Sequence, residues 1–86
     1  MTNQVTLINN DIMTELRSLK GLNLGPHNLS IIGKNIAEMI VDTTPAGETA
    51  SEWVKKNIDI IDSIIFDNID NSNMIHALQF AKLELL

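Results

Sequence analysis

The chain has no cysteine, no tyrosine and only two prolines, and its aromatic side chains are limited to two Phe and one Trp among 86 residues. Without cysteine it can form no disulfide, thiolate nucleophile or cysteine-based metal site, which fits a reducing compartment. Hydrophobic residues still make up 44% of the sequence. Because most of them are Ile, Leu, Met and Val, we expect an aliphatic core with little surface for aromatic stacking.

Positive charge is also scarce, since six Lys and Arg face eleven Asp and Glu and give a net charge of −5. An acidic chain is a poor general binder of DNA or RNA, because neutralising phosphates requires a basic face. No apolar run approaches the roughly 18 residues of a membrane span, and the N-terminus lacks the basic stretch of a leader. We therefore expect no membrane association and a location in the cytoplasm.

Groups for catalysis are absent from the pattern as well. His27 and His76 have no second His or carboxylate at the helical spacing that would build a metal site. No serine belongs to a local His and Asp set, and the glycines do not form a phosphate loop. The sequence therefore predicts a binding protein without catalytic residues, metal or cofactor.

Hydrophobic periodicity predicts an all-α single domain over residues 1–86. Its four helices are expected at about residues 9–20, 28–42, 49–69 and 73–84, as a short N-terminal helix, an antiparallel helical hairpin and a short C-terminal helix.

Capping signals set the expected helix ends. Gly21 suits a left-handed residue after the first helix, and Asn28 suits the N-cap of the second. Thr49 and Glu52 have the spacing of a capping box, and residues 70–72 break and cap before the last helix. Gly33, inside the second helix, predicts close approach of another backbone or of a ligand.

The third predicted helix carries more apolar residues than one packing stripe requires. Trp53, Val54, Ile58 and Ile60 begin a series that continues to Ile69. We therefore expect self-association to bury part of this helix.

One basic cluster stands out in the acidic chain. Arg17 and Lys20 end the first predicted helix, and Lys34 lies one turn into the second. If Lys20 and Lys34 meet near the positive N-terminal end of the second helix, they form a compact anion site. The alternative is that they are separate solvated charges.

In this order the elements resemble the phage anti-CBASS sponges, small helical proteins that sequester cyclic oligonucleotides. The resemblance covers about residues 14–69. The residues that carry it are Arg17, Leu19, Lys20, Gly21, Ile32, Lys34 and Trp53.

The resemblance implies a homo-oligomer, expected to be a hexamer, that binds cyclic dinucleotides, and with less support cyclic trinucleotides, between subunits without cutting them. Lys34 matches the family's phosphate-contacting lysine. Leu22 stands where the family has a base-stacking Tyr, and Asn23 where it has an Arg. Stacking would then depend on Trp53, His27 or Phe66, although a Trp in the first turn of a helix is more often a core residue.

The second hypothesis is an acidic helical inhibitor or adaptor that binds a host protein through apolar surface. The two hypotheses differ in where the extra apolar surface is buried. A sponge buries it against further copies of itself, whereas an inhibitor keeps it for its target.

Overall fold

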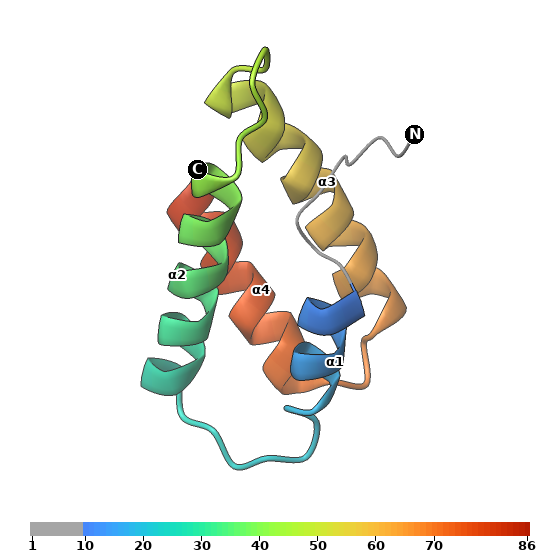
Figure 1. Ribbon diagram of the computed structural model, residues 1–86. Helices are drawn as coiled ribbons and strands as arrows, with labels where there is room; N and C mark the ends of the chain where they lie inside the picture. Colours follow the sequence, from blue (N-terminus) through green and yellow to red (C-terminus); the bar gives the residue numbers. More distant parts are fainter. Residues whose placement is uncertain (1–9) are drawn as a thin grey trace.

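The structure, a computed structural model, describes residues 10–86 and contains four helices within this range (Figure 1). The expected first residue of the first helix, Asn9, lies outside the described residues. The all-α class is confirmed. The helices are α1 (Asn10–Arg17), α2 (Pro26–Asp42), α3 (Ala50–Asp67) and α4 (Ser72–Leu85).

The ends of α1 and the start of α2 differ from the predicted boundaries. α1 stops at Arg17, and the chain then turns into Gly21, whose φ of 80° confirms the predicted left-handed residue. The prediction that Asn28 caps α2 was wrong. Gly25 is the N-cap and Pro26 the first helical residue, because the fixed φ and missing N–H of proline suit that position.

The predicted caps of α3 and α4 are confirmed. The Thr49 hydroxyl accepts a hydrogen bond from the Glu52 backbone N–H at 3.1 Å. The Asn71 side chain accepts one from the Met74 N–H at the same distance. α3 ends two residues earlier than predicted, at Asp67.

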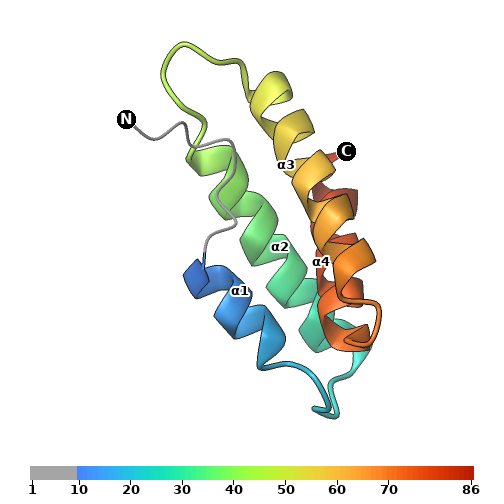
Figure 2. The ribbon, with the colours of Figure 1, turned by 90° about the vertical axis from the view of Figure 1, so that its right-hand side faces the viewer.

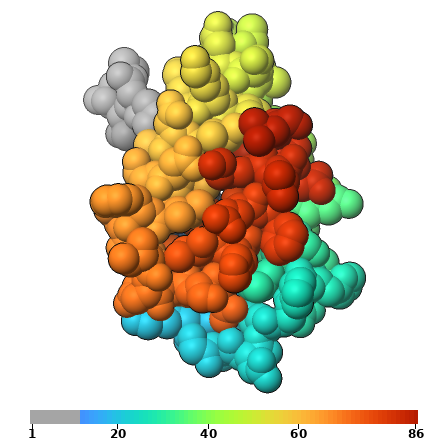
Figure 3. All heavy atoms as spheres, turned by 180° about the vertical axis from the view of Figure 1, so that it is seen from behind, coloured from blue at the N-terminus to red at the C-terminus, as the bar shows by residue number. Residues whose placement is uncertain are grey.

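α2 packs most closely on α4, although the hairpin was expected between α2 and α3. α2 and α3 run in opposite directions (Figure 2), while α4 lies between them on the far face of the molecule (Figure 3). At the crossing, a methyl group added to Gly33 would lie 2.5 Å from the carbonyl oxygen of Ala77 and 2.8 Å from the backbone nitrogen of Ala81. Gly33 therefore permits a close helix crossing.

All four helices contribute residues to the core. Trp53 is 2% exposed, and its Nε1 donates a hydrogen bond to the Ile40 carbonyl oxygen at 2.8 Å. This bond joins the start of α3 to the end of α2. The buried hydrophobic residues are Leu16, Leu29, Ile36, Ala37, Ile40, Trp53, Ile61, Met74, Ala77, Leu78 and Ala81.

Candidate functional site

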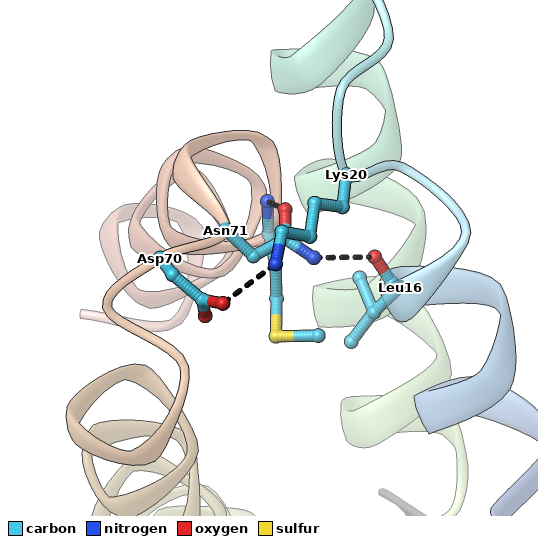
Figure 4. Close-up of polar contacts among 5 residues, drawn as sticks. Leu16, Lys20, Asp70 and Asn71 are labelled. Carbon is cyan, nitrogen blue, oxygen red and sulfur yellow. Dashed lines mark hydrogen bonds and ion pairs between the residues drawn. The ribbon is translucent and has the colours of Figure 1, made fainter.

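Lys20, one of the predicted anion-binding residues, is held by a carboxylate. Its Nζ lies 2.6 Å from Oδ2 of Asp70, in the connection between α3 and α4 (Figure 4). The hydrogen bond from Lys20 and the charge of its ammonium lower the pKa of Asp70. The ammonium is thus turned toward Asp70 and satisfied there.

Two asparagines at the start of α4 hold the end of α1 and the loop after it. Nδ2 of Asn73 donates to the carbonyl oxygens of Leu19 at 2.6 Å and Leu22 at 2.8 Å. Nδ2 of Asn71 donates to the carbonyl oxygen of Leu16 at 3.4 Å (Figure 4). These side-chain donors therefore tie the backbone at and after the end of α1 to the start of α4.

The anion site expected from Lys20 and Lys34 is not formed in the structure. Because α2 begins at Pro26, Lys34 lies eight residues along it, about 12 Å from its first residue. The field of a helix terminus falls off within the first turn. Lys34 is exposed, and the described part of the chain shows no ion pair for it.

The other predicted ligand-binding residues differ in their exposure. Arg17 is the exposed last residue of α1, and Leu22 and Asn23 are exposed in the loop that follows. Trp53 cannot offer a stacking face in this conformation, because it is buried and hydrogen-bonded in the core. The family's stacking Tyr and its neighbouring Arg thus have no counterpart of similar chemistry at Leu22 and Asn23.

Two further ion pairs engage lysines. Lys56 pairs with Glu48, and Lys82 pairs with Asp62. Over residues 10–86 there is no group of three or more His, Asp or Glu side chains that could hold a metal ion. Within the same range, no helix has both the length and the apolar character needed to cross a bilayer.

One apolar hollow is a groove between α1 and α2, here called the α1–α2 groove. Its volume is about 320 Å³. α1 contributes Ile12, Glu15 and Leu16, the turn after it contributes Leu19, and α2 contributes Ile32, Asn35, Ile36 and Met39.

Apolar side chains are also exposed elsewhere on the surface. On α3, Phe66 is 79% exposed, so the expectation that self-association buries part of this helix stays a prediction. The other large apolar residues of α3 are buried or half-buried by neighbouring helices. The exposed large hydrophobic residues are Leu22, Ile31, Met39, Val41, Phe66, Ile69, Leu83 and Leu86.

Two shallower hollows lie at the ends of the molecule. One, of about 580 Å³, lies where Val54 and Ile58 of α3 approach Leu85 and Leu86. The other, of about 380 Å³, lies where α2 and α4 begin, and His76 is part of its lining. Neither brings together a set of charged groups.

Sequence reasoning missed the α1–α2 groove. The apolar residues of α1 and α2 were read as core, and periodicity alone does not say whether two apolar stripes meet. The available signal was the seven-residue loop between Lys20 and Asn28, which allows α1 to lie away from α2. Comparison with protein-family models, curated proteins and solved structures gave no match in any of the three.

Proposed function

We propose that this protein is a non-catalytic interaction module that binds another protein through exposed apolar surface. The observation that carries the proposal is the α1–α2 groove, an apolar hollow of about 320 Å³. Met39 borders it and is 44% exposed. Apolar surface that is hollowed and rimmed by polar groups is typical of sites that bind proteins or ligands.

Affinity capture from an extract of the cells that express the gene tests this proposal. The tagged wild-type chain is compared with a Met39→Lys/Phe66→Lys double variant. We expect the double variant to lose a protein that the wild type retains, because two exposed apolar contacts are replaced by charge. A control variant, Ala46→Lys/Ser63→Lys, adds the same charge at exposed positions outside the apolar surface. If all three chains retain the same proteins, the proposal is wrong.

The second candidate is a sponge for cyclic dinucleotides, or for larger cyclic oligonucleotides, that blocks anti-phage signalling. It is favoured by Lys34, which is exposed and without an ion pair in the described range, at the position of the family's phosphate-contacting lysine. Among the described aromatic residues, Phe66 is the one exposed for stacking. An oligomer, with a hexamer as the form implied by the resemblance, belongs to this candidate.

Thermal shift against cyclic di- and trinucleotides separates the two candidates. A specific ligand at 100 times its dissociation constant adds about 2.7 kcal/mol to the free energy of unfolding. We expect Lys34→Glu to abolish such a shift and leave the fold intact, because Lys34 points away from the core. Lys55→Glu is the matched control, since Lys55 is also an exposed helical lysine. A shift that survives Lys34→Glu removes Lys34 from the site.

A further inference from the structure

α1 and α2 face each other without packing together. No Cα atom of α1 lies within 8 Å of a Cα atom of α2, whereas directly packed helices have axes about 8–10 Å apart and interleaved side chains. α1 is held instead by α4, through the asparagine contacts and the pairing of Lys20 with Asp70. The space between the two helices is the α1–α2 groove.

The dimensions of the groove match the apolar face of a third helix. Its lining runs from Ile12 in α1 to Leu19 in the turn after it, and from Met39 to Ile32 on α2. The stretch on α2 advances seven residues, which is two turns and about 10 Å. A bound helix places its anchor residues at i, i+4 and i+7 over the same length.

The charges around the groove have one sign. Glu15 is part of the lining, and Asp42 lies at the end of α2 just beyond Met39. Within the described residues neither carboxylate is in an ion pair. Three cations adjoin the lining in sequence. Lys20 is paired with Asp70, and Arg17 and Lys34 lie about 150° around their helices from the centre of the lining. A partner with positive charge beside its apolar face therefore complements this groove.

We propose that the α1–α2 groove binds an amphipathic helix of a partner protein that carries Lys or Arg beside its apolar stripe. This inference rests on the proposed interaction function and names the site and the chemistry of the partner. A second copy of the chain is a poorer occupant, because it has the same net charge of −5 and like charges oppose each other at the rim.

Two synthetic helical peptides of about 18 residues, long enough to form a helix in water, test the proposal directly. They share one Leu stripe, and one has Lys at the flanking positions where the other has Glu. Fluorescence anisotropy with the full chain is expected to show the Lys peptide binding at least about tenfold more tightly. The difference is expected to shrink as salt is raised, because salt screens exposed charges.

Matched variants then locate the binding site. Met39→Lys and Glu15→Lys are each expected to weaken the Lys peptide about tenfold, through lost apolar contact and reversed charge. Val41→Lys is the control for Met39→Lys, because Val41 is on the same helix and is 45% exposed compared with 44% for Met39. Glu38→Lys is the control for Glu15→Lys, because Glu38 is exposed but outside the lining. Both controls are expected to leave the affinity unchanged.

Several results would overturn the groove proposal. These are equal affinity for the two peptides, no binding of either, or equal losses in the control variants. If the chain forms a dimer that dissociates in the Met39→Lys variant but persists in the Val41→Lys variant, the groove binds a second copy. Tighter peptide binding by the full-length Leu7→Lys variant would assign it to the chain's own N-terminal residues. If the peptides fail while affinity capture still depends on Met39 and Phe66, the interaction function stands and this site is wrong.

Discussion

Gly33 shows how a single residue decides which helices pack. An added methyl would lie 2.5 Å from a backbone carbonyl oxygen of α4 and 2.6 Å from Cβ of Phe80. Neither neighbour is the end of a flexible side chain, so the helices themselves must separate to admit it. The close crossing of α2 and α4 depends on the absence of that methyl.

We expect Gly33→Ala to lower the free energy of unfolding by about 1–3 kcal/mol, the usual cost of overpacking. This exceeds the gain of up to about 1 kcal/mol that Ala has over Gly in a helix. Urea denaturation measures the net change in the free energy of unfolding that these two effects produce. Lys34→Ala, one position further on the exposed side, is the control and should be near neutral. A more stable Gly33→Ala protein would contradict the close crossing.

The sequence predicted Gly33 better than it predicted Trp53. A glycine inside a helical stripe has few uses, and close approach is the commonest of them. A tryptophan near a helix start fits both a core position and an exposed stacking face. The choice was decided by the Ile40 carbonyl oxygen, which accepts the indole hydrogen bond from another helix. No local pattern contains that information.

At the scale of elements, α1 is the helix with the fewest attachments to the rest of the fold. Leu16 is its buried residue, and its polar attachments come from the start of α4. Asn73 donates to two carbonyl oxygens, those of Leu19 and Leu22. Few contacts give an element low local stability against opening.

We therefore expect Asn73→Ala to speed amide exchange in residues 10–22 and to leave α2, α3 and the rest of α4 protected. Each lost hydrogen bond contributes about 0.5–1.5 kcal/mol to holding the segment. Hydrogen–deuterium exchange with mass spectrometry reads the segments separately. Asn28→Ala, at an exposed amide with no role in the attachment of α1, is the control. Uniform acceleration along the chain would mean that α1 does not open on its own.

Acid should loosen the same attachment. Lys20 holds the pKa of Asp70 below its usual value, so the pair contributes its stabilisation above the carboxyl range and loses it as the pH falls through the lowered pKa. Below about pH 4 we expect faster exchange in α1. In a Lys20→Met protein, the part of this acid-induced rise in amide exchange that the ion pair causes should be absent. If both proteins respond identically, the exposed pair does not fasten α1.

Element ends were predictable where a side chain caps them and less so elsewhere. Thr49 and Asn71 cap through their own oxygens, and both starts lie within a residue of the expected position. α2 starts two residues before the predicted position, because Pro26 is its first residue and Gly25, not Asn28, is its N-cap. That shift also moved Lys34 a further half turn from the helix start, which removed the expected anion site.

At the scale of the whole molecule, the sequence predicted four helices but not which helices pack against each other. Helical periodicity identifies which face of a helix is apolar, while the choice of neighbour depends on shapes such as Gly33 against Ala77 and Ala81. The α1–α2 groove arises because α4 fills the space beside α2. The candidate site is therefore a product of packing, which the linear pattern does not encode.

Mass in solution tests the central claim most directly. An interaction module that keeps its apolar surface for another protein should be monomeric when pure, because a buried core forms within one chain. Light scattering during size exclusion at micromolar concentration should give the 9.5 kDa of a single chain, unchanged on dilution. A stable hexamer would contradict the account, since the exposed apolar residues would then be contacts between copies, and it would favour the cyclic-nucleotide sponge.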